Sequence, residues 1–525
     1  MSYQFAWHPQ VWTLLAPMMV TCGAALFILM AELFVKNVAW KWPALFGLAA
    51  ATALVLARWN TPLAQAEEAL WGALRADRFT LFLQVAILLA AALSILSAHS
   101  YGALSSTRRG EFYVLVLLAT TGMMVLVSAG DLITMFLGLE LLSFPTYVLC
   151  GFLRRQIKSN ESALKYFVLG SFASSIFLYG VALVWGAAGS TRLVDIGAAA
   201  PTPLLLLGTL LLVIGFLFKV GAAPFHMWVP DVYEGAPTPV TMFMATAVKL
   251  AAFGAFTRAL IVAFLRDSLP LEGILWWLAC VTMIVGNLSA LTQVNIKRLL
   301  AFSSVAHAGY MLLGLTAVAA SGSTDGAAAV LYYLLAYTFM NIGAFTVVML
   351  LGRRAEGGLL FERDWSGIAR KHPILGLAMA LFMIALGGLP PTAGFFGKYS
   401  LFRTAIDAGL VSLVVIAVLN TLVSVYYYLR VIVAMYMRPE REPSVPVLES
   451  AGRAHAFDGP GAMAAEEIAS APPPRLSERG AWAARVVVLI CVIATLWLGM
   501  GPSRGAVPGM SRIMQWAEDA VASLR

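Results

Sequence analysis

The sequence predicts an all-α, polytopic membrane protein with about 14 transmembrane helices. Of its 525 residues, 60% are hydrophobic and only 12% are charged, whereas soluble domains are about 45–50% apolar and about 25% charged. Apolar runs of about 20 residues recur along the chain, and a helix of that length crosses a ~30 Å hydrocarbon core. The sequence lacks the ~10-residue alternating strands of a transmembrane barrel. We therefore expect helices throughout.

The apolar segments follow one another with short connections. The predicted spans are residues 12–34, 43–57, 79–97, 112–129, 131–151, 162–186, 203–234, 240–264, 274–293, 299–318, 326–352, 374–406, 408–437 and 484–501. Lysine and arginine gather in the loops after odd-numbered spans, for example at Arg154, Arg155 and Lys158. Under the positive-inside rule those loops face the cytoplasm and both termini lie outside. The first ten residues carry no Lys or Arg, so we expect no signal peptide and a retained first span.

Several function classes are excluded by what the sequence lacks. The four cysteines are each isolated in an apolar run, without the spacing of a zinc, iron–sulfur or disulfide framework. Neither a dinucleotide-binding nor a P-loop motif is present, so we expect no cofactor in this chain. The formal charge of +8 is spread over inter-span loops, which does not indicate nucleic-acid binding. The energy that drives this protein is therefore expected to be supplied from outside this chain.

Two segments place Gly and Pro beside a Lys inside a span. They are residues 215–239, in span 7, and residues 386–399, in span 12. A broken helix is tolerated in a bilayer only where its freed backbone faces protein or a water-filled cavity. Two breaks five spans apart predict two inverted five-helix repeats, an arrangement typical of transporters. The alternative is a pair of packing kinks, but the adjacent lysines favour a functional role.

This pattern divides the chain into five parts. They are three N-terminal spans in 1–111, a first antiporter-like repeat in 112–264, a second, inverted repeat in 274–437, a flexible cytoplasmic linker in 438–483, and the last span with its tail in 484–525. The linker is rich in Pro, Ala, Glu and Arg and has no apolar face. A docking role for it is the alternative.

One carboxylate is predicted near the middle of the membrane. Counted from Asp131 at a rise of ~1.5 Å per residue, Glu140 lies ~13.5 Å deep, where a charge without a partner is costly. Lys219, just before the first break, and Lys249, near the midplane of its span, are the expected partners. Burial and pairing act in opposite directions on a lysine ammonium, so we expect a proton switch. A purely structural ion pair is the alternative for Glu140, and snorkelling is the alternative for Lys249.

Further titratable residues extend this set. Lys165 could compete for Glu140 or snorkel to the surface, and Lys398 mirrors Lys219 after the second break. His307, mid-span, could pass protons along a hydrated chain or be an ordinary core histidine. Asp231 and Glu234 are expected in a loop, at a cytoplasmic entrance or simply solvated. The hydroxyl residues that could hold water between these titratable residues are Tyr332, Tyr333, Tyr337, Thr338, Ser424 and Tyr426.

The segments around these residues resemble the antiporter-like subunits of respiratory complex I, most closely their N type. The matching pieces are GDLITMFLGLELLSFPTYVL, SNESALKYFVLGS, FKVGAAPFHMWVPDVYEGAPTPVTMFMATAVKLAAF, NIKRLLAFSSVAHAGYML and GLPPTAGFFGKY, within about residues 110–435. The resemblance implies a proton relay in which Glu140 is the essential carboxylate and Lys165 its modulator. Lys219 and Lys249 are then central relay residues and Lys398 the distal lysine. The M-type subunit would carry Glu at that distal position, so a titratable group of either sign is expected to work there.

The resemblance also implies surroundings for the chain. It implies the bacterial inner membrane, a neighbouring M-type subunit, small J and K subunits, and partner subunits that use NADH, FMN, iron–sulfur clusters and quinone. The implied function is proton translocation coupled to electron transfer in those partners, without a redox centre in this chain. The alternatives are a subunit of a multisubunit cation/proton antiporter or membrane-bound hydrogenase, and a purely structural membrane scaffold.

Overall fold

The structure is a computed structural model that describes residues 9–35, 38–61, 67, 70–101, 110–265, 270–352, 365–439, 478–500 and 510–524. Within these ranges every regular element is a helix, and two isolated β-bridges join Leu74 to Ala129 and Asp131 to Arg192. The prediction of an all-α membrane protein is thereby confirmed. Most of the predicted linker, residues 440–477, lies outside the described residues.

The first half of the chain forms long apolar helices and one broken pair. The elements are α1 (Pro9–Phe34), α2 (Lys41–Ala57), α4 (Arg78–Ala98), α5 (Gly110–Ser128), α6 (Leu132–Cys150), α7 (Ile157–Ala188), α8 (Leu193–Ala198), α9 (Pro203–Val220) and α10 (Trp228–Gly235). The next predicted span is one continuous helix, Thr238–Phe264, with two π-helical turns. Its parts are α11 (Thr238–Phe243), η1 (Met244–Val248), α12 (Lys249–Ala259) and η2 (Leu260–Phe264).

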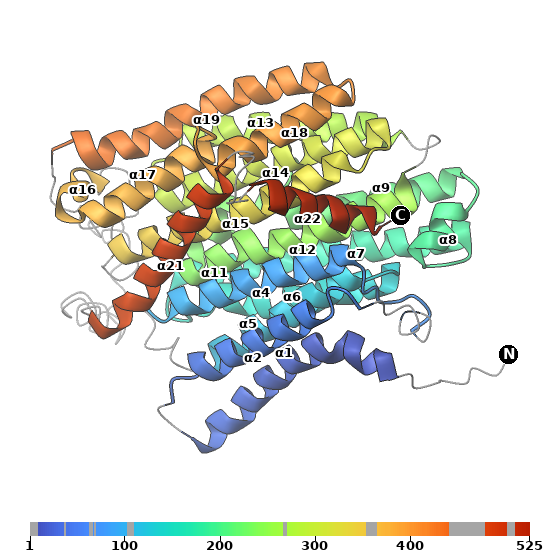
Figure 1. Ribbon diagram of the computed structural model, residues 1–525, viewed down its shortest axis with the longest axis horizontal. Coiled ribbons are helices and arrows are strands. Elements are labelled where there is room, and N and C mark those ends of the chain that lie inside the picture. The colour runs from blue at the N-terminus through green and yellow to red at the C-terminus, as the bar shows by residue number, and fades with distance from the viewer. Residues whose placement is uncertain are drawn as a thin grey trace, which may run out of the picture.

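The second half of the chain also forms long helices and one pair of helices separated by a break. Its elements are α13 (Leu271–Leu291), α14 (Ile296–Ser321), α15 (Asp325–Leu351), α16 (Ile368–Lys371), α17 (Pro373–Gly387), α18 (Ala393–Asp407), α19 (Val411–Met437), α21 (Glu478–Leu498) and α22 (Met510–Ala522). Figure 1 shows the long helices lying side by side, with α1 and α2 along one edge and α19 along the opposite edge.

Twelve helices among the described residues are long and apolar enough to cross a membrane. The apolar helices α2 and α17 are shorter, with 17 and 15 residues. Twelve of the predicted spans thus coincide with one helix each, and the spans 203–234 and 374–406 each coincide with two helices separated by a break. The full count of fourteen stays a prediction. The division into two inverted repeats also stays one.

Both predicted breaks interrupt a helix in the same manner. Gly221 directly follows α9 and Gly388 directly follows α17, and both glycines adopt a left-handed backbone with φ of 73° and 80°. That conformation suits Gly because it has no Cβ. The chain resumes as α10 after the first break and as α18 after the second. The two breaks therefore end helix segments inside the bundle and free backbone groups there.

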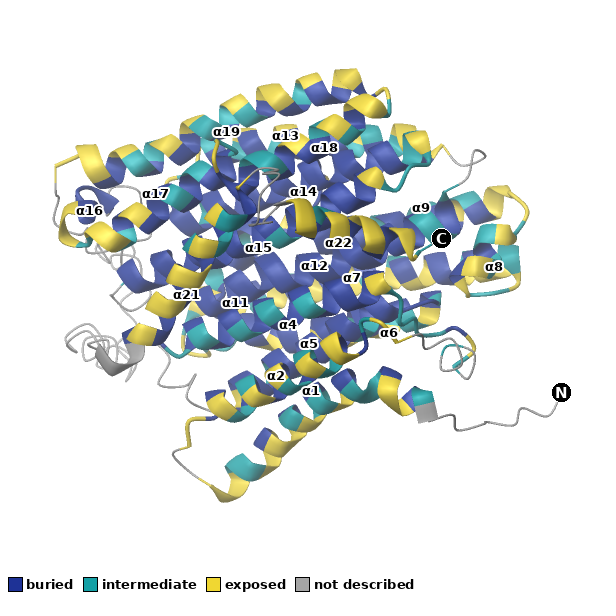
Figure 2. Ribbon diagram, viewed as in Figure 1, coloured by how far each residue is buried: buried dark blue, intermediate teal, exposed yellow. Residues whose placement is uncertain are grey.

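The core of the bundle is formed by the helices that carry the predicted central residues. α14 is completely buried over its most apolar stretch, and α15 and the α11–η2 helix are nearly so. Figure 2 shows these helices in dark blue, with the exposed residues on α1, α19 and other peripheral helices. Most residues on these inner helices are consequently buried within the bundle.

Candidate proton-relay site

Lys219 is held by neutral oxygen atoms and aromatic rings. It is the second-to-last residue of α9, two residues before Gly221, and is 5% exposed. Its Nζ donates hydrogen bonds to Ser143 Oγ on α6 at 2.7 Å and to Tyr166 OH on α7 at 3.4 Å. It also lies over the rings of Tyr147 and Tyr166, 5.6 and 5.2 Å from their centroids. Ring faces attract a cation, so this site suits an ammonium group.

Glu140 does not make the close ion pair predicted with Lys219. It lies one helical turn before Ser143 on α6, close enough to interact electrostatically with Lys219. None of the ion pairs among the described residues includes it. Its Oε1 is buried and lacks a hydrogen-bond partner in the described part of the chain. Ser143 occupies the place next to Lys219 Nζ, which leaves one carboxylate oxygen without a partner inside the membrane.

Lys165 has other partners than the predicted Glu140. Its Nζ pairs with Glu161 one turn earlier on α7 at 2.5 Å and with Asp231 on α10 at 2.8 Å. Its side chain is 40% exposed. It therefore belongs to a surface cluster at one end of the bundle. Any influence on Glu140 must act over a distance.

Asp231 and Glu234 lie on the short helix α10, not in the predicted loop. Arg298 at the start of α14 binds both carboxylates, at 2.7 and 3.1 Å. Lys158 at the start of α7 binds Glu234 at 2.9 Å. The loops predicted on one side of the membrane, before α7 and before α14, are thus brought to one end of the bundle. We name residues Lys158, Glu161, Lys165, Asp231, Glu234 and Arg298 the α10 cluster.

The α10 cluster keeps both α10 carboxylates ionised. Burial alone would raise the pKa of Asp231, but hydrogen bonds and charges from Lys165 and Arg298 outweigh it and hold that pKa below its ordinary value. Burial acts in the same direction on the pKa of Glu234, and Lys158 and Arg298 likewise hold it low. The cluster ties α10 to α7 and α14 through charge.

Lys249 lies in the centre of the bundle, 2% exposed. It is the first residue of α12 and follows the π-helical turn η1. Such turns often occur at functional positions. Its Nζ donates to the backbone carbonyl of Ser304 on α14 at 2.5 Å and lies 5.7 Å from the ring centroid of Tyr337 on α15. Sequence reasoning placed Lys249 near the midplane but gave no signal for the π-helical turn.

His307 is enclosed by tyrosines. On α14, its Nδ1 lies 2.6 Å from Tyr333 OH and its Nε2 lies 3.1 Å from Tyr428 OH. Tyr428 OH is also hydrogen-bonded to Ser303 Oγ. A neutral imidazole donates from one nitrogen and accepts at the other, so this arrangement joins two hydroxyls through one ring. His307 also lies within electrostatic range of Lys249 and Lys398.

Only some of the predicted hydroxyl residues join this group. Tyr333 and Tyr337 contact His307, with the Tyr337 ring centroid 5.0 Å from that of the imidazole. Tyr332 donates to the carbonyl of Leu498 instead, and Tyr426 is 64% exposed. The hydroxyls of Thr338 and Ser424 bond to carbonyls of their own helices. Tyr428, which the sequence did not single out, contributes more than these four.

Lys398 mirrors Lys219 in being bound by neutral groups. It lies on α18 after the second break and is 3% exposed. Its Nζ donates to the carbonyl of Gly387 at 3.2 Å, at the end of α17. The ammonium lies 4.7 Å from the ring centroid of Tyr310. A Cβ on Gly388 would lie 2.8 Å from Lys398 Cδ, so the break also fixes the path of this side chain.

One buried ion pair was missed by sequence reasoning. Arg258 on α12, 3% exposed, binds both oxygens of Asp77 at 2.6 and 2.8 Å and the Thr80 hydroxyl at 2.7 Å. Burial alone would raise the pKa of Asp77, but Arg258 holds it below its usual range. An arginine inside the predicted span 240–264 was the available signal. The pair lines a polar cavity of about 200 Å³ with Glu67 and Arg75.

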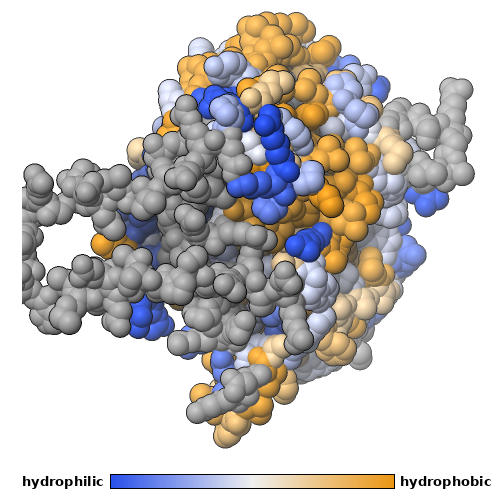
Figure 3. Space-filling model, turned by 90° about the vertical axis from the view of Figure 1, so that its left-hand side faces the viewer, coloured by the Kyte–Doolittle hydropathy of each residue, from blue (hydrophilic) through white to orange (hydrophobic). Residues whose placement is uncertain are grey.

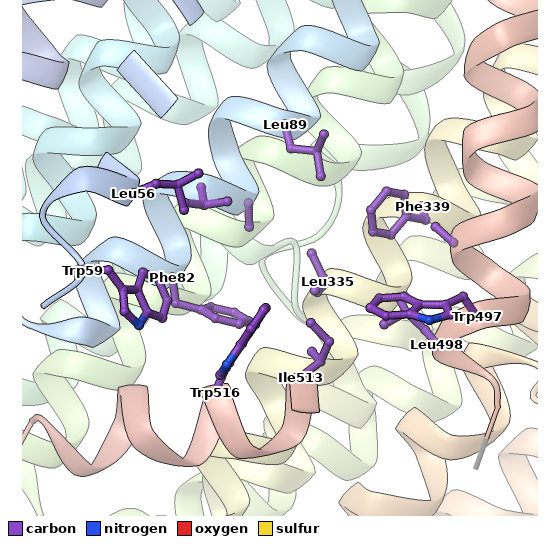
Figure 4. A pocket seen from close by; sticks show the side chains of 13 residues that line it. Leu56, Trp59, Phe82, Leu89, Leu335, Phe339, Trp497, Leu498, Ile513 and Trp516 are labelled. Atoms are coloured by element: carbon purple, nitrogen blue, oxygen red, sulfur yellow. The ribbon is translucent and has the colours of Figure 1, made fainter. Parts of the chain in front are cut away.

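A separate apolar cavity lies away from these charges. It has a volume of about 550 Å³ and opens between α2, α4, α15, α21 and α22. Figure 4 shows Phe82, Trp497, Ile513 and Trp516 around it. Its lining carries no titratable side chain, so it offers no group for proton transfer. No cluster of three potential metal ligands occurs in the described ranges.

The chain is similar to known membrane proteins. Residues 129–424 match the NADH:quinone oxidoreductase/Mrp antiporter transmembrane family. The chain is 47% identical over 408 residues to NADH-quinone oxidoreductase subunit N of Trichlorobacter lovleyi, covering 76% of this chain and 82% of that one. It is 43% identical over 443 residues to subunit N 2 of Rhizobium meliloti, covering 82% and 90%.

Solved structures show the same fold. A chain of respiratory complex I from Thermus thermophilus with bound aureothin superposes with a TM-score of 0.73 at 35% identity, covering 92% of this chain and 98% of that one. A chain of the Mrp complex from Dietzia sp. gives a TM-score of 0.75 at 24% identity, covering 97% of each chain. The second likeness concerns the fold alone.

Proposed function

Because the chain belongs to the NADH:quinone oxidoreductase/Mrp antiporter family, we propose that it is a proton-translocating membrane subunit of an NADH-quinone oxidoreductase. It corresponds to subunit N of its relatives. NADH, flavin, iron–sulfur clusters and quinone are used by partner subunits, and this chain moves protons without electron chemistry of its own. The bacterial inner membrane is its location, with the α10 cluster on the cytoplasmic side and both termini outside.

The observation that carries this proposal is the set of buried titratable groups Lys219, Lys249, His307 and Lys398. Each lysine donates to neutral oxygens, and none of the three takes part in an ion pair with a described residue. An ammonium bound in this way keeps its proton less firmly than one paired with a carboxylate. It can therefore release a proton when its surroundings change. Charged groups at membrane depth are expensive and mark ion or proton pathways.

The roles follow from the positions of these groups. Glu140 lies near Lys219 without contacting it, so a small shift of α6 or α9 changes the charge that Lys219 experiences. Lys249 and Lys398 are both close enough to His307 to interact with it electrostatically. The imidazole and the tyrosine hydroxyls bound to it can transfer protons between the two lysines by donating and accepting in turn. Residues 112–264 and 274–437 are the two repeats that carry the two halves of this path.

The experiment uses the assembled complex in proteoliposomes. Lys249→Ala removes the central proton carrier, so we expect the rate of NADH-driven proton translocation to fall at least about tenfold, since positioned proton transfer is worth about 10²–10⁴-fold in rate. Arg403→Gln is the matched control, because that cation is 70% exposed and pairs only with Asp407 among the described residues. Unchanged pumping by the assembled Lys249→Ala complex would remove Lys249 from the path.

The partners are tested separately. By resemblance to its relatives, the neighbours are an M-type subunit and small subunits such as J and K. Co-purification with flavin and iron–sulfur subunits is the expected result. Isolation with small antiporter subunits alone would favour the alternative, a multisubunit cation/proton antiporter.

A further inference from the structure

Asn287 on α13 is a completely buried amide that the proton path described above does not include. Its Nδ2 donates to the backbone carbonyl of Met283 at 2.9 Å and to Oδ1 of Asn420 on α19 at 3.2 Å. Its Oδ1 accepts a hydrogen bond from the hydroxyl of Tyr427, also on α19, at 3.1 Å. Asn287 therefore joins α13 to α19 through both ends of its amide group.

The partners of Asn287 lie on the inner side of α19. The outer side of this helix is hydrophobic and is exposed at Val415, Leu419 and Leu422. Figure 3 shows hydrophobic surface at the top of the molecule, where Figure 1 places α19. Asn420 and Tyr427 are by contrast buried. Buried polar groups of membrane helices often only tie helices together, so the direction of each hydrogen bond decides whether this amide does more.

Two backbone carbonyls fix which atom of each amide faces which partner. A carbonyl oxygen accepts hydrogen bonds and cannot donate them. The carbonyl of Met283 therefore faces Nδ2 of Asn287, and the carbonyl of Ile416 faces Nδ2 of Asn420 at 2.9 Å. Oδ1 of Asn287 is then the atom that faces Tyr427, and this oxygen can only accept. The hydroxyl hydrogen of Tyr427 is consequently committed to Asn287.

Tyr427 lies beside a hydroxyl of the proposed proton path. Its ring centroid is 4.5 Å from that of Tyr428, and the two hydroxyls are close enough to interact. The Tyr428 hydroxyl is the one bound to Nε2 of His307 and to Ser303. A phenol has one hydrogen to donate. If Tyr427 turned its hydrogen toward Tyr428, it would compete with His307 for the same oxygen atom.

We propose that Asn287 is a positioning residue of the proton path: its Oδ1 holds the hydrogen of Tyr427 and thereby leaves the oxygen of Tyr428 to His307. This inference rests on the proposed function, because it requires that His307 and Tyr428 pass protons. Asn287 acts through Tyr427 and carries no proton itself. Asn420 serves helix packing alone, because it binds the other end of the amide.

The test measures the rate of NADH-driven proton translocation by the intact complex in proteoliposomes, at equal complex content. Asn287→Leu keeps the branched shape of the side chain and removes the acceptor of Tyr427. We expect the rate to fall roughly tenfold, since a misplacement of ~1 Å can cost about 10²-fold in rate. Asn420→Leu is the matched control. It breaks the same bond between α13 and α19 but leaves Oδ1 of Asn287 with Tyr427, so its rate should stay near that of the wild type.

Tyr427→Phe gives the decisive comparison. It removes the hydrogen that Asn287 holds, so Tyr427→Phe alone should pump normally, and combined with Asn287→Leu it should restore most of the lost rate. Replacing both partners of a hydrogen bond by apolar groups can be nearly neutral. The Tyr310 hydroxyl, which also lies near this amide, accepts from Thr421 at 3.1 Å as well and keeps that bond in every variant. A role of Asn287 in helix packing alone would not be rescued by Tyr427→Phe.

Three results would overturn the proposal: equal loss of pumping in Asn287→Leu and Asn420→Leu, a normal rate in Asn287→Leu, or no rescue by Tyr427→Phe. If Asn287→Leu assembles poorly, Asn287→Ala, which adds no volume, takes its place with the same expected order of rates. Lys249→Ala is measured in parallel. Slow pumping by Lys249→Ala with normal pumping by Asn287→Leu removes only the role of Asn287, whereas normal pumping by Lys249→Ala removes the proposed proton path and this inference together.

Discussion

Each of the three buried lysines lies among groups of negative partial charge. Lys219, Lys249 and Lys398 all donate to an oxygen of a neutral group, and each lies over at least one tyrosine ring. Carbonyl oxygens and ring faces are negative in partial charge. These sites therefore bind a cation or a neutral amine well, and a carboxylate poorly.

These surroundings change the proton pumping that we expect of Lys398→Glu. The sequence predicted that Glu would be tolerated better than Ala, because either sign of titratable group could exchange protons. A carboxylate at position 398 would instead face the Gly387 carbonyl and the Tyr310 ring. We expect Lys398→Glu to pump no better than Lys398→Ala, measured as protons per NADH in proteoliposomes at equal complex content. Clearly better pumping by Lys398→Glu would restore the simple relay model.

The sequence identified the residues of the site better than their contacts. Lys219, Lys249, His307 and Lys398 stood out because charged or titratable side chains are rare in apolar spans. Their partners come from helices distant in sequence: Ser143 contacts Lys219, and Tyr428 contacts His307. A serine or tyrosine in a membrane helix is common and carries no pattern of its own. The close pair Glu140–Lys219 was wrong for that reason.

At the scale of elements, glycines set the approach of α13 and α14. A Cβ on Gly286 would lie 2.5 Å from the backbone nitrogen of Ala306, and one on Gly309 would lie 2.8 Å from that of Met283. The two contacts are reciprocal, so the helices touch through backbone at two levels. Membrane helices commonly pack through such small residues. The position of His307, on α14 between these contacts, depends on this packing.

Gly286→Ala should therefore force α13 away from α14. Overpacking of this kind costs about 1–3 kcal/mol, and we expect a lower melting temperature of the complex and weaker pumping. Gly273→Ala on the same helix is the matched control, since nothing lies within 4 Å of its Cβ. Equal melting temperatures for the two variants would show that the helices separate freely.

The α10 cluster gives a second prediction at this scale. The carboxyl pKa values of Asp231 and Glu234 are held low in the folded protein, so their contribution is present above the unfolded carboxyl pKa of about 4 and is lost as pH falls below it. Hydrogen exchange of residues 228–235 should stay slow from neutral pH down to about 4. Arg298→Gln lets both pKa values rise toward ordinary values.

In Arg298→Gln the protection of α10 should consequently be weaker at neutral pH and should depend less on pH than in the wild type. The cost at neutral pH should be about 1–2 kcal/mol, between that of exposed and buried pairs, since these side chains are partly exposed. An unchanged exchange profile would mean that apolar packing alone holds α10.

The elements themselves were largely predictable from sequence. Hydropathy gave the long helices, and Gly with Pro gave the two breaks, because these signals are local. Helix α10 was mistaken for a loop, since it has only eight residues and its carboxylates bind Arg298 and Lys158, which are distant in sequence. The π-helical turn before Lys249 likewise depends on packing within the bundle and leaves no local signature.

Over the whole molecule, charge is concentrated at the two ends and in the buried core between them. The α10 cluster lies at the end where α7 and α14 begin, and the Asp77–Arg258 pair lies where α4 begins and α12 ends. Both end groups are fully paired salt bridges, whereas the buried lysines are bound by neutral atoms. The proposed proton path accordingly runs through the core groups, because the paired ends hold their charges firmly.

The substitution Glu140→Gln tests whether the charge of Glu140 controls proton transfer at Lys219. Glu140→Gln keeps the shape of the side chain and removes its charge, while Ser143 and Tyr166 still hold Lys219. Since Glu140 has a buried oxygen without a partner among the described residues, its removal should not destabilise the fold, and the complex should assemble. The rate of NADH-driven proton pumping should nevertheless fall at least about tenfold, because the charge that acts on Lys219 is gone. Glu272→Gln, an exposed carboxylate on α13, is the control. Normal pumping by an assembled Glu140→Gln complex would refute electrostatic control by Glu140, whereas failure to assemble would show that this carboxylate is structural.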